Sequence, residues 1–127
     1  MTRVAIMGAA GRMGKVLIEA VQQGQGVSLG AAIVSPTSSL VGADAGELAG
    51  VGKLGVSVHH SLVEVADDFD VLVDFTNPKL TLTNLEACAS LGKAMVIGTT
   101  GLSEEDKQVL QQQAQHTPVV FAPNMSV

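Results

Sequence analysis

The sequence predicts an α/β fold of the Rossmann-like, doubly wound kind, with a mainly parallel sheet and helices on both faces. Short apolar runs alternate with segments of helical periodicity, as in chains built from βαβ units. The runs are apolar throughout, which is typical of parallel strands covered on both sides. The first run leads directly into a glycine-rich turn, GAAGRMG, at residues 8–14.

The predicted strands follow one another at intervals that leave room for helices. They occupy Arg3–Met7, Val27–Val34, Val56–Val58, Asp70–Asp74, Ala94–Ile97 and Val119–Phe121. The least regular part is 35–55, which is rich in glycine, serine and alanine. We expect one short helical turn there, around Ala45–Leu48, and otherwise loop.

Three longer helices are predicted from their capping residues and apolar spacing. The first follows Gly14 and ends at Gly24. The second begins at Asn77-Pro78, an N-cap followed by proline at the first helical position, and stops at Gly92. The third opens with Ser103-Glu-Glu-Asp106, a capping-box pattern whose acids suit a helix N-terminus.

Length and composition indicate one globular domain, 1–127, and the glycine motif discussed next makes it a predicted dinucleotide-binding domain. Of the 127 residues, 46% are hydrophobic and 15% are charged, which argues against disorder. A net charge of −5 and the absence of tryptophan and tyrosine argue against a nucleic-acid partner. Cys88 is the only cysteine, so no disulfide within the chain and no cysteine-based zinc site is expected. No segment has membrane-spanning length, and a cytoplasmic location is expected.

The glycine motif lies where a dinucleotide fingerprint belongs, after a strand and before a helix. Gly8 would permit a tight turn, Gly11 would let backbone amides approach a pyrophosphate, and Gly14 would let the helix pack closely. Its spacing is Gly-x-x-Gly-x-x-Gly rather than the commoner Gly-x-Gly-x-x-Gly. A glycine-containing strand–turn–helix without a ligand is the alternative interpretation.

Two features beside the motif bear on the ligand. Arg12 would offer a guanidinium to phosphate oxygens, the alternative being a solvated surface arginine. The second predicted strand ends in Val34-Ser-Pro-Thr-Ser38, without the carboxylate that usually reads an adenosine ribose. Hydroxyls of Ser35, Thr37 and Ser38 could serve either a ribose or its 2′-phosphate, or could simply belong to a polar turn.

Two further loops follow strands at the same predicted edge of the sheet. Gly98-Thr-Thr-Gly101 offers a flexible backbone and two hydroxyls, which suit a nicotinamide ribose or a substrate carboxylate. Ala122-Pro-Asn-Met-Ser126 offers an amide side chain that both donates and accepts. Each loop alone is ordinary turn chemistry, but their shared placement favours a ligand site.

Five stretches together resemble the N-terminal part of the bacterial 4-hydroxy-tetrahydrodipicolinate (dihydrodipicolinate) reductase family. They are VAIMGAAGRMG, DAGELAG, VDFTNP, VIGTTG and FAPNMSV, in the order found in the family and spanning essentially the whole chain. The resemblance implies an oxidoreductase of diaminopimelate and lysine biosynthesis. Such an enzyme transfers a hydride from NADPH or NADH to a cyclic unsaturated dicarboxylate, giving tetrahydrodipicolinate.

The resemblance also implies positions for the cofactor. Gly8 to Met13 would hold the pyrophosphate, and Phe75 and Thr76 would line the cofactor groove. Thr100 would lie near both the nicotinamide and the substrate carboxylate. The implied cofactor-binding residues are Gly8, Ala9, Ala10, Gly11, Arg12, Met13, Ser35, Gly98, Thr99, Thr100, Ala122, Pro123, Asn124 and Met125.

The family's proton-donating and substrate-binding residues, a histidine-rich stretch and a lysine, have no counterpart here. We therefore expect no catalytic residue within this chain and a substrate-binding and tetramerisation domain beyond Val127. On its own, the fragment is expected to be inactive and monomeric. His59, His60 and His116 are interpreted as surface residues rather than substitutes. Asp67, Asp68 and Asp70 could suggest a cation site, but are interpreted as a solvated charge run before a buried strand. Asp74 ends a predicted strand near the ligand edge and is a further candidate there.

The chain departs from the family pattern at the end of the second strand. Many members carry an acid followed by arginine where this chain has Val34-Ser35, so preference between NAD and NADP is left open. The alternative functions are another two-domain nicotinamide oxidoreductase, of the aspartate-semialdehyde or homoserine dehydrogenase type, and a non-catalytic nucleotide-sensing module.

Overall fold

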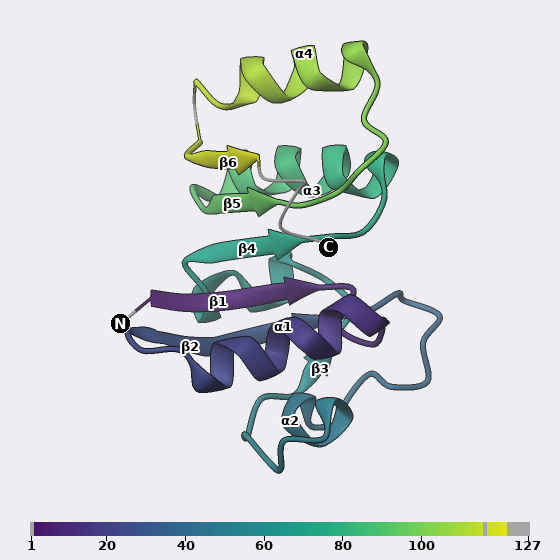
Figure 1. Ribbon diagram of the computed structural model, residues 1–127, viewed down its shortest axis with the longest axis vertical. Helices are drawn as coiled ribbons and strands as arrows, with labels where there is room; N and C mark the ends of the chain where they lie inside the picture. Colours follow the sequence, from purple (N-terminus) through teal and green to yellow (C-terminus); the bar gives the residue numbers. More distant parts are fainter. Residues whose placement is uncertain (1, 116, 122–127) are drawn as a thin grey trace.

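A six-stranded parallel sheet forms the centre of the computed structural model, which describes residues 2–115 and 117–121. The strand order is β3-β2-β1-β4-β5-β6, and each neighbouring pair runs parallel. Figure 1 shows this order from β3 at the bottom to β6 near the top. The strands are β1 Thr2–Met7, β2 Val27–Ile33, β3 Val58–His59, β4 Val71–Asp74, β5 Ala94–Ile97 and β6 Val119–Phe121.

Helices cover both faces of the sheet, as predicted. They are α1 Arg12–Gln23, α2 Ala45–Ala49, α3 Pro78–Leu91 and α4 Glu104–Gln113, with a 3₁₀ helix η1 at Val63–Asp68. In Figure 1, α1 crosses in front of the sheet while α3 lies behind it. This arrangement follows from right-handed crossovers that run outward in opposite directions from β1 and β4.

The predicted boundaries of α3 and the predicted start of α4 are confirmed by the caps that form, whereas α1 begins at Arg12, before Gly14, and ends at its C-cap Gly24 as predicted. Asn77 accepts a hydrogen bond from the Leu80 amide, and Gly92 ends α3 in the left-handed conformation with φ +70°. Ser103 and Asp106 form the reciprocal capping box at the start of α4.

The third strand differs from the prediction. It begins at Val58 rather than Val56 and contains His59, which was expected to follow the strand. Ser57 instead makes an isolated antiparallel bridge to Asp44, which draws the chain away from β2 before Val58. The prediction was wrong because the apolar pattern of 56–58 carries no trace of that long-range contact.

The segment 35–55 is held in place by Asp44. Its carboxylate caps α2 at Glu47 and accepts hydrogen bonds from the amides of Leu54 and Gly55, at 3.0 and 2.8 Å. These bonds, led by that from Leu54, lower the pKa of Asp44. The single short helix predicted there is confirmed as α2.

The core is divided by the sheet into two apolar layers. One layer joins α3, α4 and η1 to the sheet and contains Phe69, Leu72, Leu85 and Leu110. The other joins α1 and α2 and is centred on Ile6 and Ile18. Each layer buries the side chains of alternate strand positions, which fixes the strands in register.

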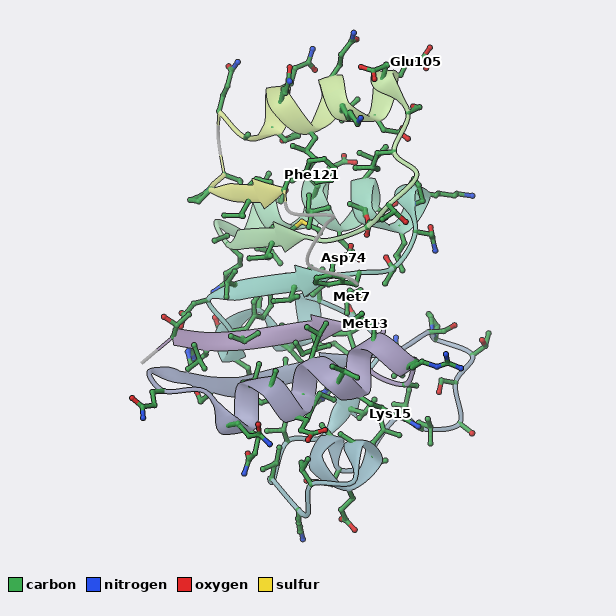
Figure 2. The ribbon with its side chains drawn as sticks, viewed as in Figure 1. Met7, Met13, Lys15, Asp74, Glu105 and Phe121 are labelled. Atoms are coloured by element: carbon green, nitrogen blue, oxygen red, sulfur yellow. The ribbon has the colours of Figure 1, made fainter. Side chains whose placement is uncertain are left out.

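The strand order reverses between β1 and β4. Met7 and Asp74, the last residues of these two strands, are register partners, and Figure 2 shows them side by side at the sheet's carboxyl edge. Two loops leave in opposite directions from this point and open a crevice, which is where ligands bind in doubly wound sheets.

Candidate dinucleotide site

The glycine motif forms a tight loop between β1 and α1. Gly8 has φ +76°, a conformation that glycine adopts readily, and its amide and that of Ala9 both donate to Ile33 O, at 2.9 and 3.0 Å. The Gly11 amide then donates to Gly8 O. The predicted turn at Gly8 is therefore confirmed.

Gly14 permits a close contact between α1 and this loop. A Cβ atom at Gly14 would overlap the carbonyl oxygen of Gly8 and lie 2.7 Å from Cα of Ala9. The predicted close packing is confirmed, although the first turn of α1 packs on the loop itself rather than on a strand.

The N-terminus of α1 leaves backbone donors available. Gly11 is its N-cap and supplies no side-chain acceptor, whereas α2, α3 and α4 are capped by Asp44, Asn77 and Ser103. The first helical hydrogen bond runs from the Lys15 amide to Gly11 O, so the amides of residues 12–14 have no acceptor among the described residues. Such amides, at the positive end of a helix dipole, suit a phosphate group.

A cleft of about 430 Å³ opens in front of these amides. Arg12 lines it, is exposed, and makes no ion pair with any residue in the described part of the chain. Ser35 and Ser38 line the cleft from the end of β2, and Phe75 and Thr76 from the end of β4. Five of the six predicted phosphate-loop residues contribute: Gly8, Ala10, Gly11, Arg12 and Met13; Ala9 is instead fully buried.

The turn after β2 is preorganised by its hydroxyl groups. Ser35 Oγ lies 3.0 Å from Thr37 Oγ1 and accepts the Thr37 amide, while Ser38 Oγ accepts the Leu40 amide. Val34 is buried, whereas Ser35, Pro36 and Thr37 are exposed. The strand therefore presents hydroxyls and no carboxylate at the cleft.

A second cavity of about 580 Å³ adjoins the first and shares Met7, Gly8, Val34, Ser35 and Thr76 with it. Its other side is mostly apolar, with Leu62, Val63, Leu80 and Ala87, and His60 also borders it. The two cavities together run over the carboxyl ends of β1, β2 and β4.

Residues 2–125 match the family model described as "Dihydrodipicolinate reductase, N-terminus". The chain belongs to the dihydrodipicolinate reductase family. It is 61% identical over 127 residues to the 4-hydroxy-tetrahydrodipicolinate reductase of Hahella chejuensis and 60% identical to that of Chromohalobacter salexigens. All of this chain is matched, but it spans about half the length of these relatives, 48% and 47%.

A solved structure of the family has the same fold. The dipicolinate-bound dihydrodipicolinate reductase of Paenisporosarcina sp. TG-14 is 24% identical and superposes with a TM-score of 0.69, over 97% of this chain and 47% of that one. This likeness establishes the Rossmann-like architecture of the chain.

The loop at 98–101, predicted to offer a flexible backbone and two hydroxyls to a ligand, is partly packed into the fold. Gly98 is buried under the ring of Phe75, which occupies the space that a Cβ atom would need. Thr99 is also buried, and its hydroxyl lies 2.7 Å from that of Thr81. The Thr99 hydroxyl is therefore directed to Thr81, whereas Thr100 is exposed. Neither cavity includes this loop, and Ala122, Pro123, Asn124 and Met125 lie outside the described residues.

The other titratable candidates have local partners. His60 is exposed and lies 3.5 Å from Glu64, and His59 Nδ1 lies 3.0 Å from Ser57 O. Asp70 pairs with Arg3, while His116 lies outside the described residues. Across 2–115 and 117–121, no cluster of histidine, cysteine and acidic side chains could hold a metal ion, and no helix is long and apolar enough to cross a membrane.

Asp74 is the residue whose importance the sequence understated. It is fully buried and accepts hydrogen bonds from Thr76 and Asn84. The available signal was an acid at the end of an apolar strand with threonine two positions later, which alone resembles an ordinary Asx turn.

Proposed function

We propose that this chain is the dinucleotide-binding domain of an NADPH- or NADH-dependent oxidoreductase that reduces 4-hydroxy-tetrahydrodipicolinate to tetrahydrodipicolinate, in diaminopimelate and lysine biosynthesis. Family membership supports the reaction. The observation that carries the cofactor role is the uncapped start of α1, where three backbone amides face a cleft lined by Arg12. The residues present therefore suit a diphosphate.

The proposed cofactor follows the two cavities and then crosses the sheet edge. The pyrophosphate binds along the loop from Gly8 to Met13, at the available amides of the first turn of α1 and with Arg12, and the adenosine ribose faces Ser35. The adjoining apolar cavity beside Leu80 suits an adenine ring. From the family resemblance, the proposed contacts of the nicotinamide end are Gly98, Thr99 and Thr100, together with Ala122 to Met125, which lie outside the described residues. Thr100, exposed on this loop, faces the substrate carboxylate.

The nicotinamide, when bound, supplies the hydride. This chain's own residues bind and orient. The buried Thr99 hydroxyl holds the loop that carries Thr100, so the contribution of Thr99 to a ligand is its backbone. Proton donation to the substrate is assigned to a further domain, in line with the half-length match to the relatives. A homotetramer and a cytoplasmic location belong to the same proposal.

Both reduced cofactors are accepted in this proposal. A carboxylate at the end of β2 would attract a ribose 2′-hydroxyl and repel a 2′-phosphate. Here the cleft is lined instead by Ser35, Ser38 and the cationic Arg12, none of which would repel a 2′-phosphate.

The test is titration of NADPH and NADH into the intact protein and into this chain, read from nicotinamide fluorescence, followed by turnover with the dicarboxylate substrate. The absence of tryptophan and tyrosine removes the usual protein background for this chain. We expect both forms to bind, and only the intact protein to oxidise the cofactor. Binding without turnover by the intact protein would favour a nucleotide sensor, and turnover with another substrate would favour a different dehydrogenase.

A further inference from the structure

Asp74 is a fully buried acid at the centre of the ligand edge. Its Oδ1 atom accepts the Thr76 amide at 2.9 Å and the Thr76 hydroxyl at 2.5 Å, and its Oδ2 atom accepts Asn84 Nδ2 at 3.0 Å. No cation in the described part of the chain pairs with it. Burying a carboxylate without a counter-charge is costly, and these three hydrogen bonds are what compensates the Asp74 carboxylate for the loss of water.

Phe75 and Thr76, which directly follow Asp74, lie between the glycine loops at 8–14 and 98–101. The methyl group of Thr76 lies beside Gly8, where an added Cβ would be 3.1 Å from Cγ2, and the ring of Phe75 covers Gly98. Residues 75 and 76 thus separate the loop proposed for the pyrophosphate from the loop proposed for the nicotinamide. Any shift of Thr76 would alter the spacing between the two.

The main chain of Asp74 reaches the second loop as well. Its carbonyl oxygen accepts the Gly98 amide at 2.8 Å and the Thr99 hydroxyl at 3.4 Å. Through Thr99 the network continues to Thr81 on α3, the helix that also carries Asn84. One residue therefore ties together the ends of β4 and β5 and the first half of α3.

We infer that Asp74 is a positioning residue for the dinucleotide, acting through Thr76 to set the distance between the phosphate loop and the loop at 98–101. Asp74 lines neither cavity, whereas Thr76 lines both. The inference rests on the proposed function, because its ligand is the cofactor proposed there. Binding residues keep a productive geometry when supporting hydrogen bonds and packing fix them in place.

The test compares NADPH affinity in the intact wild-type protein, Asp74→Asn, and the swap Asp74→Asn/Asn84→Asp. Asp74→Asn replaces the oxygen that faces Asn84 by an NH2 group. In the observed orientation of Asn84 two nitrogen donors would then face each other, and the hydrogen bond between residues 74 and 84 would be lost. The swap restores an acceptor at position 84 and leaves the new amide oxygen at position 74 for Thr76. We expect about tenfold weaker binding for Asp74→Asn, the effect of one lost charged hydrogen bond, and recovery of most of it in the swap.

A control is Thr117→Val, which alters a buried threonine just before the start of β6, away from the carboxyl ends of the strands where Asp74 lies. It should leave NADPH affinity unchanged. Thermal unfolding of every variant separates loss of folding from loss of positioning. If Asp74→Asn does not fold, Thr76→Val removes only the hydroxyl already bound to Asp74 and keeps the methyl contact; its NADPH binding should still weaken measurably.

The outcomes separate this inference from the proposed function. A wild-type protein that binds no dinucleotide would refute the proposed function. Wild-type affinity in folded Asp74→Asn, or in Thr76→Val where that variant is the one used, would refute the positioning role alone. Because Asn84 also lines the second cavity, the swap is compared with Asn84→Asp as well, and a folded swap that binds no better than either single variant would also refute the positioning role.

Discussion

Arg3 and Asp70, 67 residues apart, join the starts of β1 and β4 through a two-pronged contact. Asp70 Oδ1 lies 3.0 Å from Arg3 Nη2, and Oδ2 accepts the Arg3 amide at 2.8 Å. The Asp70 amide in turn donates to Arg3 O. The side-chain hydrogen bond from Arg3 is the main reason that the pKa of Asp70 falls to about 2.

This pair predicts a specific acid dependence of stability. An aspartate in an unfolded chain has a pKa of about 3.9, so the stabilisation is fully present above about pH 4 and is lost as the pH falls toward 2. Asp70→Asn should lower the melting temperature at pH 7, and the difference from wild type should vanish near pH 2. Asp67→Asn is the control: Arg3 binds only its main-chain oxygen, so that variant should melt close to wild type.

Gly14→Ala should destabilise the fold. The added methyl group overlaps the backbone of Gly8 and Ala9, neither of which can rotate away, and overpacking of this kind costs about 1–3 kcal/mol. Urea unfolding followed by circular dichroism measures the loss. A variant as stable as wild type would mean that α1 can move off the loop at little cost.

Gly11→Ala should separate binding from folding at the same motif. A Cβ there would lie 3.3 Å from Gly8 O with no other atom within 4 Å, so the free energy of unfolding should change little. Dinucleotide affinity should fall, because the approach of a diphosphate to the amides of α1 depends on a bare backbone. Unchanged NADPH affinity in this variant would contradict the proposed position of the pyrophosphate.

Arg12→Ala should weaken dinucleotide binding by about tenfold or more, the effect of a lost charge-assisted hydrogen bond. It should also reduce the salt dependence of the affinity. Lys15→Ala removes the same charge one turn later, outside the cleft lining, and should cost much less. Titrations of NADPH at two ionic strengths make the comparison; equal losses in the two variants would indicate only a general charge effect.

Ser35→Asp should create discrimination between the two cofactors. The new carboxylate would repel a 2′-phosphate and attract a ribose hydroxyl, so NADPH affinity should drop while NADH affinity is kept or improved. Ser39→Asp places the same charge on the same loop but outside both cavities. Parallel losses of NADPH binding in both variants would show that position 35 does not face the ribose.

Local sequence signals determined most of the architecture before any tertiary contact was considered. The caps at Asn77 and Ser103, the stop at Gly92 and the turn at Gly8 act within a few residues, so their patterns could be interpreted directly. The apolar strands predicted a sheet buried on both faces for the same reason. The family match agrees with the motifs quoted from the sequence.

Only the tertiary structure decided which polar groups are free to meet a ligand. Thr99 and Thr100 are equivalent in sequence, yet packing against Thr81 uses the first hydroxyl and leaves the second exposed. The bridge between Ser57 and Asp44 shifts the start of β3. Asp74 is buried with its carboxylate hydrogen-bonded because Asn84, ten residues later on α3, donates to it. These outcomes depend on contacts between distant segments, which set burial and hydrogen bonding but leave no periodic pattern in the chain.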